Sequence, residues 1–267
     1  MAQKVRFPGI LRHVVISREG DEWFASISVK IEDDSWIYPH RCETQTTVGI
    51  DLGIKTLATL STGEKFENPK ATKRYKRKLA HAQHEFAKKQ KGSNNREKAK
   101  LCVSKVHLKI KRSRKDVIHK MTSSIVKRFR WIGIEDLNIQ GMVKNRKLAK
   151  SVSDGAFFEI RRQLAYKSVL SGSNVAVAAR FFPSSKLFSN CKCKLEELNL
   201  SVRKWICSKC GEAHDRDENA AKNLEVVVRS HWDTLNACGE NARPQKWQFS
   251  SKQESKQNLK STDLSLD

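Results

Sequence analysis

Residues 47–53 read Thr-Val-Gly-Ile-Asp-Leu-Gly, an apolar run that ends in an acid. A short apolar run of this kind predicts a buried β-strand, and the flanking glycines let the backbone turn and approach a ligand closely. Residues 131–137 repeat the design as Trp-Ile-Gly-Ile-Glu-Asp-Leu. The sequence therefore contains two predicted strands that each end in a carboxylate, Asp51 and Glu135.

The segments around these strands give an alternating order of strands and helices. We expect two strands at 57–60 and 65–66, basic helices within 70–115, a helix at 116–129, a helix at 157–170, a strand at 175–178 and a helix from Asp217 to Arg229. Turn-forming residues between the two short strands predict antiparallel pairing with the first strand. This order predicts an α/β protein with an RNase H-like (RuvC) mixed sheet flanked by helices.

The predicted last helix opens with a polar string that is unusual for a helix. Asp215 is followed three places on by Glu218, as in a capping box. Asn219 and Asn223 are four residues apart and share one helix face, which suggests a site, and the alanines between them allow tight packing on the sheet. Asp217 lies at the start of this helix.

The three acids Asp51, Glu135 and Asp217 fit a nuclease site if they converge. Cleavage of a phosphodiester by two metals needs carboxylates that hold two magnesium ions about 4 Å apart. Taken singly, Asp51 and Glu135 also fit ordinary solvated strand ends, so the prediction depends on the three acids together. We predict that they are catalytic and bind magnesium.

The composition points to a polyanionic partner. Lys and Arg number 52 against 29 acidic residues among 267, a net charge of +23. Nucleic acid is the first candidate for such a chain, although a membrane surface would also attract it. The sequence has no run of about 18 apolar residues and no secretory leader. We expect a cytosolic protein, placed in the prokaryotic cytosol or nucleoid, with no membrane partner.

The basic charge is concentrated in residues 70–115, which contain 18 basic residues and two acidic ones. A break at 92–95 predicts two basic helices in a hairpin. Charge runs are often only solvated faces, but this one would repel itself unless phosphates neutralise it. We predict nucleic-acid backbone contacts from Lys73, Arg74, Lys76, Arg77, Lys78, Lys109, Lys111, Arg112, Arg114 and Lys115.

Four of the seven cysteines lie between residues 191 and 210, which fits a metal site better than disulfides. Cys207 and Cys210 form a knuckle whose thiolates can reach one tetrahedral zinc. The partner expected three places before Cys191 is Phe188, which cannot ligate. We predict structural zinc held by Cys191, Cys193, Cys207 and Cys210. The alternative is a ribbon that has lost its metal and is loosened before the last helix.

The remaining segments set the predicted domain division. Residues 10–31 predict a β-hairpin, and a polar stretch at 32–46 separates it from the sheet. The division is a hairpin segment at 1–46, a nuclease domain at 47–183 with its basic hairpin at 70–115, a zinc-ribbon-like insert at 184–213, the last part of the nuclease domain at 214–242 and a disordered tail at 243–267.

The motifs at 48–55, 134–138, 161–164, 207–210 and 215–223, taken in order, resemble the TnpB (OrfB) family of transposon-encoded RNA-guided DNA nucleases, relatives of type V CRISPR effectors. The resemblance implies a RuvC triad of Asp51, Glu135 and Asp217, a zinc ribbon, and magnesium and zinc as cofactors. It also implies guide RNA and DNA as partners, with base pairing reading the sequence. Family members are longer at the amino end, so we expect a shortened member whose hairpin is a remnant of a β-barrel.

Three functional hypotheses follow. An enzyme would cleave single-stranded or unwound DNA with magnesium and lose activity when Asp51 or Glu135 is replaced. A binding module would hold RNA or DNA through the basic hairpin without cleaving it. An inactive remnant of a transposon protein would fold poorly and bind little zinc. Cutting in support of a transposable element, and not strand joining, is the activity that the resemblance implies.

Overall fold

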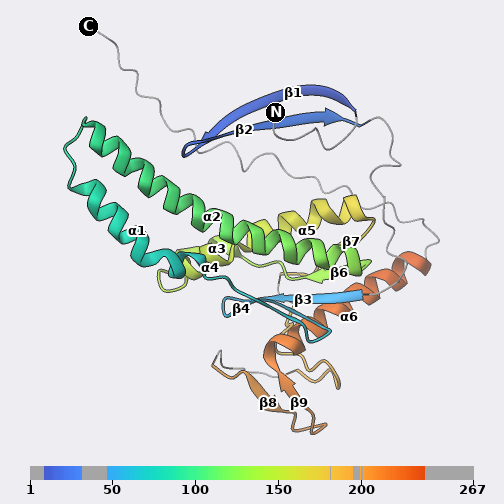
Figure 1. Cartoon of the computed structure of the whole chain (residues 1–267). Helices are drawn as coiled ribbons and strands as arrows, with labels where there is room; N and C mark the ends of the chain where they lie inside the picture. Colours follow the sequence, from blue (N-terminus) through green and yellow to red (C-terminus); the bar gives the residue numbers. More distant parts are fainter. Residues whose placement is uncertain (1–8, 32–46, 181, 195–198, 200, 238–267) are drawn as a thin grey trace.

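The computed structural model describes residues 9–31, 47–180, 182–194, 199 and 201–237 (Figure 1). Its centre is a mixed five-stranded sheet in the order β5-β4-β3-β6-β7. The strands are β3 (Thr47–Leu52), β4 (Thr56–Leu60), β5 (Lys65–Glu67), β6 (Trp131–Ile134) and β7 (Asn174–Val177). The mixed α/β class and the mixed sheet predicted from the sequence are therefore confirmed.

Strand directions place the two acidic strand ends side by side. β4 runs antiparallel to its neighbours β3 and β5, whereas β3, β6 and β7 run parallel. In the register of β3 with β6, Ile50 lies opposite Ile134. The next residue in sequence is Asp51 after Ile50 and Glu135 after Ile134. Both acids therefore lie at the carboxyl ends of adjacent strands.

The two faces of the sheet differ in side-chain size. Val48, Ile50, Ile132 and Ile134 are fully buried in the main core together with apolar residues of α2 (Asn94–Arg128) and α5 (Phe157–Ser171). The opposite face carries glycines and packs against α6 (Arg216–Ala237). In Figure 1, α2 and α5 lie on one side of β3 and α6 lies on the other.

The basic region forms a helical hairpin of α1 (Ala71–Ala87) and α2. The Ser93 hydroxyl caps α2 by accepting from the Arg96 amide, 3.2 Å away. The helix then runs unbroken through Arg128, so the predicted boundary after Lys115 is wrong. The sequence contains no glycine or proline from residue 94 to 128, and therefore one helix joins the basic hairpin to the core. Two short helices, α3 (Ile139–Lys144) and α4 (Ala149–Gly155), were not predicted.

Asp154 of α4 fastens the start of α1 to α2. Its carboxylate accepts from the Thr72 amide at 3.3 Å, from the Thr72 hydroxyl at 2.9 Å and from the Arg114 guanidinium at 2.9 Å. Asp154→Ala leaves the partly buried Arg114 without this carboxylate. We expect a loss of about 2 kcal/mol in the free energy of unfolding, since hydrogen bonds to charged groups carry energies of this order. Urea denaturation measures it.

The matched control for Asp154 is Asp116→Ala. Asp116 is exposed and pairs with Lys120 one turn away on α2, at 2.7 Å. Exposed pairs of this kind contribute less than about 0.5 kcal/mol. Equal losses in the two variants would show that Asp154 does not fasten the hairpin.

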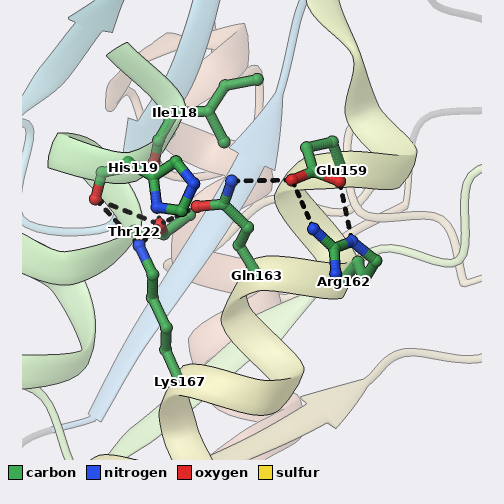
Figure 2. A network of polar contacts seen from close by, with 7 residues as sticks. All are labelled: Ile118, His119, Thr122, Glu159, Arg162, Gln163 and Lys167. Carbon is green, nitrogen blue, oxygen red and sulfur yellow. Dashed lines mark hydrogen bonds and ion pairs between the residues drawn. The ribbon is translucent and has the colours of Figure 1, made fainter. Parts of the chain in front are cut away.

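A polar network joins α2 to α5 within their apolar contact (Figure 2). Lys167 donates to the His119 carbonyl at 2.9 Å and to the Thr122 hydroxyl at 2.7 Å. The Thr122 hydroxyl also lies 2.9 Å from the Gln163 amide oxygen, and Gln163 donates to Glu159 at 2.8 Å. Burial lowers the pKa of Lys167 to about 8. The network fixes how the two helices pack over the sheet.

The predicted β-hairpin is present as β1 (Ile10–Glu19) paired with β2 (Glu22–Lys30). Its acidic turn contacts the basic part of α2 through three ion pairs, Lys105–Asp21, Lys111–Glu19 and Arg112–Glu22. Residues 32–46 and 243–267 lie outside the described part of the chain, so the barrel remnant, the disordered tail and the domain division stay predictions.

Candidate active site and metal centre

The alternation of side chains along a strand decides which face carries the acids. Residues two apart share a face, so Gly49 shares its face with Asp51, and Gly133 shares its face with Glu135. This is the face that packs against α6. Asp217 lies in the first turn of that helix. All three predicted acids therefore belong to the same layer between the sheet and α6.

Glycine allows the close approach that brings them together. A Cβ added to Gly49 would lie 1.9 Å from the Ala221 carbonyl oxygen, and one added to Gly133 would lie 2.6 Å from the Leu224 carbonyl oxygen. The backbone of α6 thus rests directly on the two central strands. Asp51 is two residues beyond Gly49, and Asp217 is one helical turn before Ala221, so both carboxylates reach the same end of the contact.

The acidic cluster, defined as Asp51, Glu135 and Asp217, is electrostatically coupled. Burial raises the pKa of Asp51 well above its usual value, and the nearby charges of Glu135 and Asp217 raise it further. Burial also raises the pKa of Glu135, partly offset by a hydrogen bond from Ser184. Confined negative charge of this kind is what a divalent cation would neutralise, so the donor set fits magnesium.

Two asparagines of α6 hold the loop that carries Ser184. The Asn223 amide donates to the Ser184 carbonyl at 2.8 Å, and the Asn219 amide donates to the Leu187 carbonyl at 2.7 Å. The Ser184 hydroxyl in turn donates to the Glu135 carboxylate. The helix face that the sequence marked as polar therefore positions Glu135 through this loop.

Charged neighbours surround the other acids. Arg203 lies 3.2 Å from the Asp217 carboxylate, and Arg161 lies 2.7 Å from the carboxylate of Asp136, the residue after Glu135. Asp215 accepts from the Asp217 amide at 3.1 Å, which confirms it as the cap of α6. No sequence pattern indicates Ser184 or Arg203, because neither has a fixed spacing to the acid that it contacts, whereas Arg161 belongs to the motif at 161–164.

The cysteine segment forms a small ribbon of β8 (Lys204–Ile206) and β9 (Ala213–Asp215). The sulfurs of Cys191, Cys207 and Cys210 all lie within 4.8 Å of one another. Cys193 is not part of this mutually close group. Phe188 is buried, with 4% of its surface exposed. Three of the four predicted thiols thus converge, a donor set that fits zinc.

The predicted nucleic-acid residues fall into two groups. Lys111 and Arg112 form ion pairs with the acidic turn of the hairpin, and Arg114 pairs with Asp154. Arg74 lies over the Tyr75 ring. The others are exposed and have no carboxylate within ion-pair distance in the described part of the chain. These others form the basic surface: Lys73, Lys76, Arg77, Lys78, Lys109 and Lys115.

The described residues define an α/β protein in which a mixed sheet carries acids at the ends of its central strands, beneath the start of a helix. A family model described as probable transposase, OrfB_IS605, matches residues 26–146, and one described as Cas12f1-like, TNB domain, matches residues 157–224. The chain belongs to the OrfB (TnpB) family.

Two relatives show the likeness along most of the chain. A protein of Streptomyces pristinaespiralis named "Putative RNA-guided DNA endonuclease" is 42% identical over 234 residues, covering 87% of this chain and 56% of that protein. InsQ of Escherichia coli K12, with the same description, is 30% identical over 247 residues, 87% of this chain and 59% of InsQ. The chain thus spans somewhat more than half the length of these relatives.

A solved structure of a Cas12f1–sgRNA–target DNA complex aligns with 79% of this chain and 55% of that chain, at 17% identity and a TM-score of 0.48. Among the described helices, none is both long and apolar enough to cross a membrane.

Proposed function

We propose that this chain carries the catalytic centre of an RNA-guided DNA endonuclease of RuvC type, with Asp51, Glu135 and Asp217 as the residues that bind magnesium. The observation that carries the proposal is the convergence of Asp51 and Glu135, at the ends of adjacent parallel strands, with Asp217 at the start of the helix packed on those strands. The names of the relatives support the same activity. A structural role does not account for three acids gathered where their charges repel.

Magnesium, when bound, would activate water and stabilise the leaving oxygen of the phosphodiester. The chain's own residues prepare that site. Ser184 orients the Glu135 carboxylate through its hydrogen bond, and Arg203 neutralises part of the charge on Asp217. The loop held by Asn219 and Asn223 keeps Ser184 in place. These contacts fix the carboxylates before any ion arrives.

Zinc would have a structural role beside this site. Cys191, Cys207 and Cys210 would hold it. The ribbon strand β9 leads through Asp215 directly into the first turn of α6. A metal that stabilises the ribbon would therefore also fix the position of Asp217.

The proposed partners are a guide RNA and DNA, held in part by the basic surface. Each phosphate contact that is lost lowers the slope of log affinity against log salt by about 0.9 for duplexes. We expect Lys73→Ala with Arg77→Ala to weaken binding and to lower this slope by about 1.8, measured by fluorescence anisotropy across a salt series.

The control removes the same charge from lysines that have local acidic partners. Lys88 pairs with Glu85 and Lys100 pairs with Glu97, each three residues away. Lys88→Ala with Lys100→Ala should change the salt slope less. Equal slopes in the two double variants would show that net charge, and not the basic surface, determines binding.

The test of the proposed function is cleavage by the purified chain together with the RNA that co-purifies with it. That RNA is sequenced, and DNA containing a matching target is added with magnesium or with EDTA. We expect cutting of the matched DNA that requires magnesium. Tight, salt-sensitive RNA binding with no cutting at any magnesium concentration would reject the nuclease and support the binding module.

A further inference from the structure

We propose that His214 supplies the fourth ligand of the ribbon's metal site, which then consists of Cys191, Cys207, Cys210 and His214 and selects zinc. This inference rests on the structural zinc of the proposed function and assigns a ligand that neither the cysteine spacing nor the comparisons give. Its ligand set of three thiolates and one imidazole is among those that close a tetrahedral structural zinc site.

The three thiols leave one position of a tetrahedral site without a ligand. The residue that spacing would place there, Phe188, is packed as an apolar side chain. Its ring centroid lies 5.1 Å from that of His214 and 6.2 Å from that of Trp205. The phenylalanine thus fills space beside His214 and contributes no donor atom.

His214 is buried and has a ring nitrogen available to bind a metal. Only 5% of its surface is exposed, and its Nε2 is buried with no hydrogen-bond partner in the described part of the chain. A buried polar atom left unsatisfied destabilises the fold, so a role that satisfies it is expected. A His214 ring nitrogen, the Cys210 sulfur and the Glu212 carboxylate all lie within 4.8 Å of one another.

Cys210 is therefore shared between two groups of potential ligands, the three thiols and the group that contains His214. Of the other candidates, Glu212 is exposed, whereas structural zinc sites use cysteine and histidine. Cys193 belongs to neither group, whereas His214, which also lies outside the three mutually close thiols, is joined to them through Cys210. His214 is the buried candidate whose donor atom is unused.

The ribbon holds the His214 ring in a defined orientation. Trp205 of β8 lies directly opposite His214 of β9 in the antiparallel register. Their rings are stacked, with centroids 6.0 Å apart and planes inclined by 26°. Because His214 lies three residues before Asp217, a metal bound there would connect the ribbon to the acidic cluster through the start of α6.

The test uses the full chain with its co-purified RNA, reconstituted with zinc or cobalt(II). X-ray absorption at the zinc edge should give three sulfurs and one nitrogen around the metal, and the cobalt spectrum should indicate a tetrahedral site. His214→Ala should weaken zinc affinity by more than about tenfold, since even outer contacts of a metal site contribute that much. The control, Cys193→Ser, should leave affinity and spectrum unchanged.

Two further variants keep the proposal testable if His214→Ala disturbs the ribbon's packing. His214→Cys should retain zinc, now with four sulfurs. Phe188→Cys combined with His214→Ala should also retain zinc, because the new thiol lies beside the position that His214 leaves. Loss of zinc from both would overturn the assignment.

The remaining outcomes separate the inference from the function on which it rests. Four sulfurs in the unchanged chain, with zinc lost in Cys193→Ser, would overturn the inference in favour of Cys193. No zinc in the unchanged chain would overturn both the inference and the structural zinc. Neither result bears on the magnesium site, which the DNA cleavage assay tests separately.

Discussion

Asp51→Asn is expected to abolish magnesium-dependent cleavage and, in metal-free protein, to raise the melting temperature. Cleavage should fall by more than about 100-fold, since altering even the outer contacts of a metal site costs 10–100-fold. The rise in stability follows because the substitution removes a charge that is buried and that is repelled by Glu135 and Asp217. Activity and stability thus change in opposite directions at one residue.

Proton linkage gives the direction in which the stability of the metal-free protein changes with pH. The pKa of Asp51 is raised in the folded chain relative to its usual value of 3.8, mainly by burial. The folded state therefore binds the proton more tightly, and its stability falls as pH rises from about 3.8 through the folded pKa. The melting temperature of metal-free wild type should decline over that window more than that of Asp51→Asn.

Calorimetry between pH 4 and 8 with EDTA measures this difference. The same measurement with magnesium then tests whether the ion stabilises each protein. Magnesium should stabilise the wild type by mass action and leave Asp51→Asn nearly unchanged. Asp116→Asn is the control, because Asp116 is exposed and pairs with Lys120 on the far part of α2. A variant at Asp51 that is less stable than wild type without metal, or that cuts normally, would contradict the assignment.

Gly49→Ala is expected to lift α6 from the sheet. The added methyl would lie 1.9 Å from the Ala221 carbonyl oxygen and 2.5 Å from the Glu225 amide nitrogen. Both are backbone atoms, so no side-chain rotation relieves the overlap. Overpacking of this kind costs about 3 kcal/mol, which corresponds to a fall of roughly 6–12 °C in melting temperature for a chain of this size.

The same displacement should reduce cleavage, because Asp217 moves with α6 away from Asp51. Thermal unfolding and the DNA cleavage assay measure the two effects. Gly92→Asn is the control: an added Cβ there meets nothing within 4 Å, and asparagine adopts a positive φ, here 81°, more readily than most residues, so the cost should be smaller. A melting temperature of Gly49→Ala equal to that of the control would show that α6 does not rest on β3 as described.

The strand core and its acids were predictable from the sequence because their signals are local. The apolar run before Asp51 and the one before Glu135 each define a buried strand, and the polar start of the last helix defines its cap. Parallel pairing of the two strands then leaves little freedom in where the acids lie. Fold class and the placement of the acids therefore follow from short patterns.

The support of the site was not predictable because it depends on contacts between distant segments. Ser184 reaches Glu135 across 49 residues, and Arg203, just before β8, reaches Asp217 of α6 across 14 residues. The change of composition at Lys115 predicts a boundary there, whereas α2 runs unbroken from Asn94 to Arg128. The close approach at Gly49 depends on α6, more than 160 residues later, and no local pattern indicates it.

The central claim is that the three carboxylates share divalent ions, and anomalous diffraction from crystals of the chain soaked in manganese tests it directly. Manganese takes the same oxygen ligands as magnesium. The account predicts anomalous peaks from manganese ions that are bound by Asp51, Glu135 and Asp217, with carboxylate oxygens about 2.1 Å from the ion. If crystals soaked in saturating manganese show peaks only elsewhere, and none at these carboxylates, the central claim is contradicted.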